Sequence, residues 1–262
     1  MSSAILYHGE PNGPSLSVLA ALEESGLAIE CRPIDLLKGE RHALPGITES
    51  VALDFAVEGE GPVLVIGGEA MTEAVFLAQY LDEQAGGCGL QPEDAYAHWQ
   101  MMMWCRQVTE RLSPAVAWLG ALAYAQADLA ARDDSEFAAL SAAIVSDDLR
   151  QRWQDLRSGV AEEAKSEDSR AKIAQFAQRA AEQLADGRDW LMGSFSIADL
   201  ETYAWLAPAA LLEPEAFSGK PQLAAWMDRV RTRPSVRRAL ARTQSGDPFR
   251  SFAPGPEINR WG

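Results

Sequence analysis

The chain has 262 residues, of which 47% are hydrophobic, and a formal net charge of −15. This length allows one large domain or two ordinary ones, and the excess of carboxylates argues against binding to nucleic acid or to an anionic membrane surface. No apolar run approaches the roughly 20 residues that span a bilayer, and no basic region precedes the first apolar residues. We therefore expect a soluble, cytoplasmic protein with no membrane partner.

The three cysteines and three histidines are too scattered for a metal site or a disulfide active site. Cys31, Cys88 and Cys105 form no Cys-x-x-Cys pair, and no histidine stands at metal-ligand spacing from them. A Ser/His/Asp set and a phosphate-binding loop are also missing. We therefore expect no metal and interpret the thiols as reduced core or surface residues.

The start of the chain predicts a strand–helix–strand unit. Residues 5–7 form a short apolar strand, and turn-forming residues follow it. Ser15 then stands where a helix N-cap is expected, and Gly26 is placed to end that helix. Residues 29–34 alternate between apolar and polar, which predicts a second strand parallel to the first.

A second unit of two strands and a helix follows. Residues 62–66 form an apolar strand, Gly67-Gly68 is a hairpin signal, and residues 69–71 form the return strand. Thr72 then opens a helix. The order strand–helix–strand, then strand–strand–helix, is that of a thioredoxin-like domain, which we expect to end near residue 84.

The rest of the chain has the pattern of helices. A glycine-rich linker spans residues 86–89, and from Asp94 to about residue 243 strand signals give way to good helix formers. The stretch 133–168 is more polar, so it is either helical with exposed faces or partly a loop. Pro221 opens a later helix, and Pro234 ends it sharply.

A capping box marks the start of one helix deep in the chain. The Ser196 hydroxyl can accept from the Asp199 N–H, while the Asp199 carboxylate can accept from the Ser196 N–H. We therefore predict an α/β thioredoxin-like domain at 1–84 and an all-α domain at 90–243. The tail, 244–262, is rich in proline and glycine and should be irregular.

A thioredoxin-like domain without Cys-x-x-Cys, followed by helices with the Ser196/Asp199 box, resembles the glutathione transferase superfamily. Pro62 matches that family's cis-proline, which exposes the backbone of the preceding residue, here Gly61, to the cysteinyl part of glutathione. The stretch from Pro221 to Pro234 resembles the family's late helix. The resemblance implies a glutathione-binding first domain, no metal, and a dimer.

Within the superfamily, several segments resemble the bacterial lignin β-etherases. These are Leu6-Tyr7, residues 12–16, 23–27 and 90–94, and the helix from residue 101 to 110. Those enzymes attack the β-carbon of an arylglycerol aryl ether with glutathione thiolate and release a phenol. The resemblance implies β-aryl ether cleavage in lignin-derived aromatics, in which glutathione is the co-substrate.

Thiolate chemistry requires a site that favours the anion, because a free thiol is mostly protonated at neutral pH. A hydroxyl at a helix N-terminus supplies a hydrogen bond and the helix dipole. Ser15 is the candidate stabiliser, with Asn12 as a second donor, although Ser15 could equally be a plain cap. Ser17 is the alternative, and Tyr7 is expected to pack.

The family holds the γ-glutamyl carboxylate of glutathione at a helix N-terminus with a Glu/Gln-Ser pair. Thr72 and Glu73 match this motif, but Ala74 replaces the serine, and Pro14 replaces an amide residue of the β-etherases. Loss of one donor to a charged group weakens binding by about 1.5–3 kcal/mol. Two further functions therefore stay open: a non-catalytic structural subunit of a heterodimer with a paralogue, and a general detoxifying transferase.

The resemblance also suggests an electrophile pocket in the first long helices of the second domain. Trp104, Trp118 and Met103 are its candidates, because rings and a pliable thioether suit an aromatic ether. The alternative is that these side chains belong to an ordinary helix-bundle core.

Overall fold

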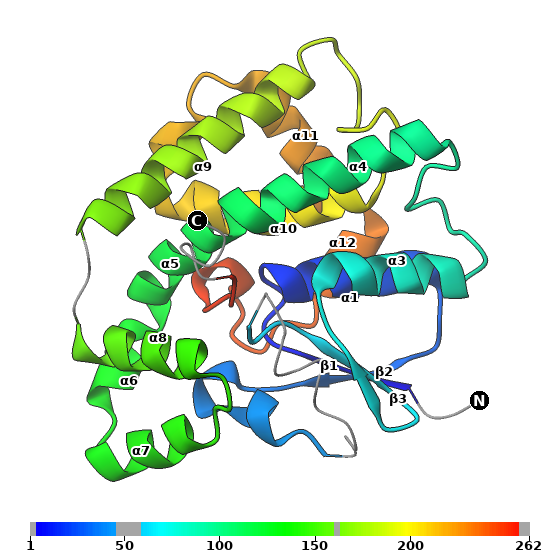
Figure 1. Ribbon diagram of the computed structural model, residues 1–262. Helices are drawn as coiled ribbons and strands as arrows, with labels where there is room; N and C mark the ends of the chain where they lie inside the picture. Colours follow the sequence, from blue (N-terminus) through cyan, green and yellow to red (C-terminus); the bar gives the residue numbers. More distant parts are fainter. Residues whose placement is uncertain (1–3, 46–58, 160–162, 257–262) are drawn as a thin grey trace.

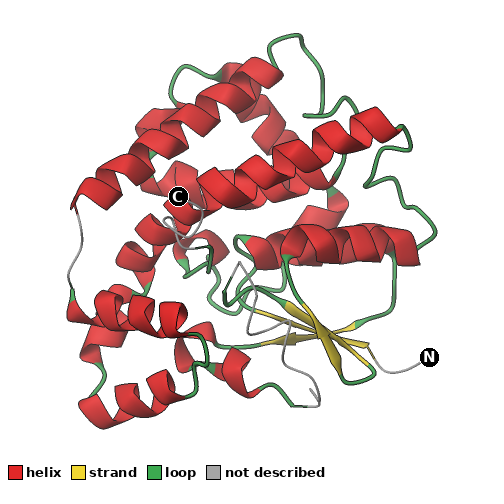
Figure 2. Cartoon of the chain, viewed as in Figure 1, coloured by secondary structure: helices red, strands yellow, loops and turns green. Residues whose placement is uncertain are grey.

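The computed structural model describes residues 4–45, 59–159 and 163–256, which form a small sheet with helices and a larger helical half (Figures 1 and 2). The strands follow the order β2-β1-β3-β4. Their bounds are β1 Ala4–His8, β2 Glu30–Pro33, β3 Val63–Ile66 and β4 Glu69–Met71. β1 and β2 pair in parallel, while β3 runs antiparallel to both β1 and β4. Both predicted units of this half are confirmed.

Helix α1, Pro14–Ser25, begins earlier than the sequence suggests. Gly13 is its N-cap and Pro14 its first residue, a position where proline's missing N–H has no helical partner to lose. Ser15 thus lies inside the first turn, so the prediction that it caps the helix is wrong. Gly26 ends α1 as predicted, at φ 64°, a left-handed conformation that glycine adopts without a Cβ clash.

Helices make up most of the rest of the described chain. They are α3 Ala74–Gln84, α4 Ala95–Gln107, α5 Ser113–Tyr124, α6 Gln126–Ala131, α7 Asp134–Ala142, α8 Asp147–Ser158, α9 Glu163–Gln183, α10 Ile197–Leu212, α11 Pro221–Thr232 and α12 Pro234–Leu240. A π-helical turn, η3, links α4 to α5, and four 3₁₀ turns complete the elements: η1 Leu36–Lys38, η2 Glu40–Ala43, η4 Pro214–Phe217 and η5 Pro248–Arg250. Among these described helices, none is both long enough and apolar enough to cross a membrane.

The polar stretch left open between helix and loop contains α7, α8 and the beginning of α9. The short helices α6 to α8 form a separate corner of the molecule (Figure 1). That corner has its own apolar cluster, which includes Phe137, Leu140 and Trp153. The described part of this stretch is therefore mostly helical, with apolar side chains packed in the cluster. The domain bounds 1–84 and 90–243 stay a prediction.

The capping box at the start of α10 is present. The Asp199 carboxylate accepts from the backbone N–H of Ser196 and of Leu191, each at 3.0 Å, and from Trp226 Nε1 at 2.8 Å. Burial raises the pKa of Asp199 to about 6 even though these hydrogen bonds lower it. One carboxylate thus joins the start of α10 to the preceding loop and to α11.

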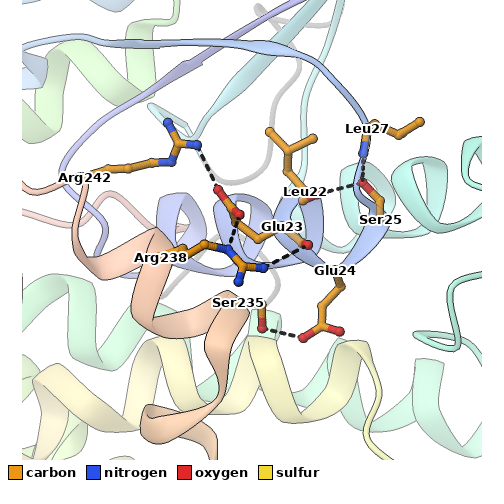
Figure 3. Close-up of polar contacts among 8 residues, drawn as sticks. All are labelled: Leu22, Glu23, Glu24, Ser25, Leu27, Ser235, Arg238 and Arg242. Carbon is orange, nitrogen blue, oxygen red and sulfur yellow. Dashed lines mark hydrogen bonds and ion pairs between the residues drawn. The ribbon is translucent and has the colours of Figure 1, made fainter.

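The two halves meet along α1, which contacts α3 on one side and α10 and α12 on the other. At the C-terminal end of α1, Glu24 binds Arg233 at 2.6 and 3.0 Å and accepts from the Ser235 hydroxyl. Glu23 binds Arg238 and Arg242 at 2.6 and 2.8 Å (Figure 3). This end of α1 is therefore held to the end of the helical half by ion pairs.

Candidate functional site

The sheet topology brings three predicted segments to one edge. Tyr7 of β1 pairs with Val63 of β3, and Leu64 pairs with Met71 of β4. Because neighbouring strands alternate in direction here, the end of β1, the start of β3 and the end of β4 lie together. The segments that continue from these strand ends carry the candidate residues Asn12, Ser15, Gly61, Pro62, Thr72, Glu73 and Ala74.

At the start of α1, the side chain of Ser15 is buried, and its hydroxyl oxygen accepts the N–H of Gly9 at 3.1 Å. A hydroxyl that accepts one hydrogen bond still has its own proton to donate. Ser15 therefore retains the donor that a thiolate requires, in the first turn of a helix whose dipole favours an anion. The structure corrects the helix position of Ser15, and its role toward a thiolate stays a prediction.

Asn12 lies beside Ser15 but uses its amide differently. Its Oδ1 accepts the N–H of Gly13 at 3.0 Å, and its Nδ2 donates to the carbonyl of Ser251 at 3.0 Å. Ser251 belongs to the C-terminal tail, 239 positions away. The second predicted donor to sulfur is thus engaged by the tail in this structure.

The alternatives to Ser15 lie away from this edge or are already bonded. Ser17 is fully buried and lies beside Glu201 of α10. The Tyr7 hydroxyl donates to the carbonyl of Pro45 at 3.3 Å and accepts from Arg32 at 3.4 Å. Tyr7 therefore packs, as predicted.

The Gly61–Pro62 bond differs from the prediction. No cis peptide bond occurs among the described residues, so the expectation of a cis-proline at Pro62 is wrong. The trans form is also the lower in energy for most X–Pro bonds. In this arrangement the Gly61 carbonyl accepts from Nε of the buried Arg41 at 2.9 Å. One backbone group expected to face the cysteinyl part of glutathione is thus already bonded.

The start of α3 combines a helix N-terminus with backbone strain. Glu73, not Thr72, is the N-cap, and among the described residues it is the one non-glycine with positive φ, at 71°. Such a conformation costs about 1–3 kcal/mol and is common at ligand sites. Ala74 follows as the first helical residue and is fully buried, so a methyl group lies where the family has a hydroxyl. Anion binding here falls to the backbone N–H groups and the helix dipole.

Sequence reasoning missed a buried carboxylate on α10. Glu201 is fully buried; burial raises its pKa and the negative charge of Glu73 raises it further, while the nearby Ser17 hydroxyl and a hydrogen bond from Trp205 Nε1 at 3.3 Å lower it. The signal was present in the sequence: this residue and the capping-box aspartate are the two charged residues of α10.

A second missed cluster joins the N-terminal half to α8. The buried Glu60 carboxylate accepts from Nε1 of Trp153 at 3.0 Å and bonds Nε2 of His42 at 2.9 Å. Glu60 stands just before Gly61, so α8 helps to fix the segment that leads into β3. Sequence spacing gives no signal for a contact over 93 positions.

The three candidates for an electrophile pocket lie in different places. Trp104 is buried, donates to the Thr202 hydroxyl at 2.8 Å and packs edge-on against Phe176, as a core residue does. Met103 lines a groove of about 450 Å³ between α4 and α9. Trp118 of α5 borders a small cavity that also touches the C-terminal tail. The structure therefore brings Trp118 toward the tail and leaves Trp104 in the core.

None of the three cysteines is an activated thiol. Burial raises the pKa of Cys31 and Cys105, and burial together with the Asp82 carboxylate raises that of Cys88 to about 12. Across residues 4–45, 59–159 and 163–256, no three His, Cys, Asp or Glu side chains are grouped to hold a metal ion. A thiolate reaction at this site must therefore use a thiol supplied by a ligand.

Comparison with known proteins agrees with this geometry. Residues 133–234 match the family model described as glutathione S-transferase, C-terminal domain. The chain is 26% identical over 253 residues to protein LigF of Sphingobium sp. (strain NBRC 103272 / SYK-6), covering 92% of this chain and 95% of LigF. Residues 133–234 therefore match a glutathione S-transferase C-terminal domain, and the chain as a whole is similar in sequence to LigF.

Solved glutathione transferases share the fold of this chain. The crystal structure of β-etherase LigF from Sphingobium sp. strain SYK-6 matches with a TM-score of 0.77 at 25% identity, covering 92% of this chain and all of LigF. Gtt2 from Saccharomyces cerevisiae matches with a TM-score of 0.66 at 23% identity, covering 90% of this chain and 100% of that one. A glutathione transferase family member from Pseudomonas fluorescens, with two glutathiones bound, matches with a TM-score of 0.63 at 16% identity, covering 91% of this chain and 92% of that one. The likeness to LigF is thus greater than to the other two.

Proposed function

We propose that this chain is a glutathione transferase that cleaves β-aryl ethers of lignin-derived aromatics, alone or as a subunit of a β-etherase. The TM-score of 0.77 to the LigF β-etherase, against 0.66 and 0.63 for the two other transferases, supports this substrate class. The observation that carries the proposal is the buried Ser15 hydroxyl, which accepts from Gly9 and keeps its own proton at the start of α1.

The proposed reaction is a displacement. The glutathione thiol loses its proton to solvent, and Ser15 stabilises the resulting thiolate by donating its hydroxyl proton in a hydrogen bond. The sulfur then attacks the β-carbon, so a C–S bond forms while the ether C–O bond breaks with its electron pair. The phenolate leaves and takes a proton from solvent. Ser15 binds and positions the anion; it forms no covalent bond.

Glutathione itself would lie along the sheet edge. Gly61 and Pro62 flank its cysteinyl part, and its γ-glutamyl carboxylate is directed to the start of α3, at Thr72, Glu73 and Ala74. The strained backbone at Glu73 supports a binding role there. The buried methyl group of Ala74 offers no hydrogen bond, so affinity should be below that of a site with serine.

A test compares Ser15→Ala with Ser17→Ala, which removes a similarly buried hydroxyl beside Glu201. We expect Ser15→Ala to slow release of phenol from a β-aryl ether model compound by about 10- to 100-fold, the equivalent of one hydrogen bond to a charged group. Ser17→Ala should retain the rate. If calorimetry shows that the wild-type chain binds no glutathione, the proposal fails.

A second candidate is a non-catalytic subunit that stabilises a paralogous partner. Three observations favour it: Ala74 lacks the hydroxyl, Arg41 occupies the Gly61 carbonyl, and Ser251 occupies the Asn12 amide. Ala74→Ser separates the two functions. A rise in glutathione affinity together with ether cleavage supports the enzyme, whereas stable co-purification with a paralogue and no affinity in either form supports the structural subunit. Turnover of halogenated aromatics alone would indicate a general transferase.

We also propose a dimer, formed with a second copy or with a paralogue. Three aromatic side chains are more than half exposed, Phe76 on α3 and the stacked pair Tyr96 and Trp99 on α4. Large exposed rings at this density are typical of protein interfaces. Light scattering of the purified chain, and of the chain co-expressed with a paralogue, measures the assembly.

A further inference from the structure

The C-terminal tail turns back into the middle of the molecule, between α1 and α5 (Figure 1). Its residues 253–256, Ala-Pro-Gly-Pro, are all buried, although they belong to no helix or strand. Burial of an irregular segment of small residues is unusual, because chain ends with few apolar side chains normally remain at the surface. The tail therefore occupies a space that the fold leaves between its two halves.

Hydrogen bonds hold this segment at both ends. The Ser251 carbonyl accepts from Asn12 Nδ2 at 3.0 Å, and the Gly255 carbonyl accepts from Nη1 of Arg152 on α8 at 2.6 Å. Further upstream, the Glu10 carboxylate binds the hydroxyl of Thr243 and the N–H groups of Gln244 and Ser245. The tail is thus tied at residues 243–245, independently of the segment that follows.

The buried segment is in close contact with the start of α1. A Cβ at Gly13, the N-cap of α1, would lie 3.0 Å from the Ala253 side chain and 3.1 Å from the Trp205 ring. At Gly255 a Cβ would lie 2.7 Å from the Ala117 side chain and 3.1 Å from the carbonyl oxygen of Ser113. These distances leave no room for another group between α1 and α5.

What remains is a cavity of about 20 Å³, large enough for about one water molecule. Tail residues Phe252, Gly255 and Pro256 form one wall, and Trp118 and Ala117 of α5 form another. An aromatic electrophile is many times larger than this cavity. An electrophile that reaches sulfur beside Ser15 from the side of α5 must therefore displace the tail.

We propose that residues 251–256 are an intramolecular plug in the electrophile end of the cleft, and that an aromatic ligand binds between Trp118 and Trp205 in place of this segment. As a statement about the electrophile, the inference rests on the proposed function. The segment is suited to exchange: apart from the half-buried Phe252, its buried residues are alanine, glycine and two prolines, so its release exposes little apolar surface compared with global unfolding. The ties at Glu10 keep the released tail close to its site.

The chain offers a matched pair of variants. Gly255→Ala places a methyl group against Ala117 and a backbone oxygen, and its φ needs no left-handed conformation, so crowding alone acts. Gly120→Ala, one turn further along α5 from Ala117, meets nothing within 4 Å. The first variant should displace the tail, and the second should leave it in place.

Tail release is measured by trypsin cleavage after Arg250, whose side chain is 63% exposed, with mass spectrometry of the peptide that begins at Ser251. Cleavage of a segment requires that it open first. We expect Gly255→Ala to speed this cleavage by about tenfold over the wild type and Gly120→Ala to leave it unchanged. Equal rates in Gly255→Ala and the wild type overturn the inference.

Occupancy by a ligand is measured with S-benzylglutathione and with the dye 8-anilinonaphthalene-1-sulfonate. A chain ending at Arg250 should bind both more tightly than a chain ending at Pro256, which keeps the plug. S-benzylglutathione should also speed cleavage after Arg250 in the wild type. Unchanged dye affinity in the shorter chain overturns the plug, and if that chain fails to fold, Gly255→Ala supplies the same comparison.

The outcomes separate this inference from the proposed function. If neither glutathione nor S-benzylglutathione binds any form, the proposed function fails, while tighter dye binding without the tail still supports a plugged aromatic pocket. If S-benzylglutathione binds but leaves cleavage after Arg250 unchanged, ligand and tail do not compete and the plug is overturned.

Discussion

The two ends of helix α1 are joined to the helical half in opposite ways. The C-terminal end uses charge: Glu24 binds Arg233, which precedes α12, and Glu23 binds Arg238 on α12 and Arg242 after it; Figure 3 draws the contacts of Glu23. The N-terminal end has no such ion pair among the described residues and uses small neutral groups, Gly13 against Ala253 and Trp205.

This difference separates a fixed end from an exchangeable one. Half-buried ion pairs with several hydrogen bonds are costly to break one partner at a time. Contacts between a glycine, an alanine and a ring edge bury little area and make no directional bond. The proposed chemistry lies at the second end, where Ser15 begins the helix, so ligand exchange there need not disturb the joint at the other end.

The largest effect is expected at the fixed end. Glu24→Ala leaves the guanidinium of Arg233, which binds both carboxylate oxygens, without its partner and frees the Ser235 hydroxyl. We expect the free energy of unfolding to fall by about 3 kcal/mol, the lower limit for breaking a buried pair, because this pair is half-buried. Urea unfolding followed by circular dichroism measures the change.

Arg238→Gln is the matched control at the same end. Arg238 binds Glu23, but its side chain is 56% exposed. Exposed pairs typically contribute less than about 1 kcal/mol. If Arg238→Gln proves as destabilising as Glu24→Ala, burial does not distinguish these pairs and the fixed end has no single anchor.

A smaller effect on stability is expected at the exchangeable end. Gly13→Ala introduces a Cβ at φ 50° and ψ −132°, a conformation that L residues rarely adopt, against Ala253 and Trp205. We expect a loss of about 1–2 kcal/mol, because part of the clash is relieved by movement of the tail. Urea unfolding measures this loss, and trypsin cleavage after Arg250 should accelerate. Unchanged cleavage would mean that α1 and the tail are not coupled.

The smallest effect on stability is expected from lowering the pH. Burial alone would raise the pKa of Glu24, but hydrogen bonds from Arg233 and Ser235 outweigh it, so its pKa lies below the usual 4.5. Its contribution to stability is therefore present above pH 4.5 and is lost as the pH falls through the lowered value. The difference in unfolding free energy between wild type and Glu24→Gln should shrink below pH 4.5. If this difference in unfolding free energy does not change with pH, Glu24 does not have the lowered pKa.

Asp199 should respond with the opposite sign. Burial raises its pKa to about 6, so its contribution is complete below the unfolded value near 3.8 and is lost as the pH rises through 6. This change is common to wild type and Glu24→Gln and cancels in their difference. The subtraction therefore isolates the ion pair at the end of α1.

Several parts of the fold were predictable because their signals are local. The Gly67-Gly68 hairpin, the Gly26 helix end and the Ser196/Asp199 capping box each depend on residues a few positions apart, and the structure confirms all three. The errors were also local: Pro14 favours the first helical position and moved the start of α1 before Ser15.

The sequence named candidate site residues but not the bonds that they make in the fold. Short motifs named Ser15, Gly61 and Glu73, whose segments lie at one sheet edge, and their roles stay predictions. No pattern in the sequence indicated that Arg41 binds the Gly61 carbonyl or that Glu201 is buried beside Ser17. These are contacts between elements, which the periodicity of a single element does not record.

The sequence by itself determined the order of strands and helices in the first half and several element ends, because caps, turns and apolar periodicity act over a few residues. Only the tertiary structure decided which distant segments lie against the candidate site. The bond from Asn12 to Ser251 spans 239 positions, and the packing of Gly255 on α5 follows from the return of the tail into the interior. Such contacts depend on the path of the whole chain, since burial is shared among elements that no local signal connects.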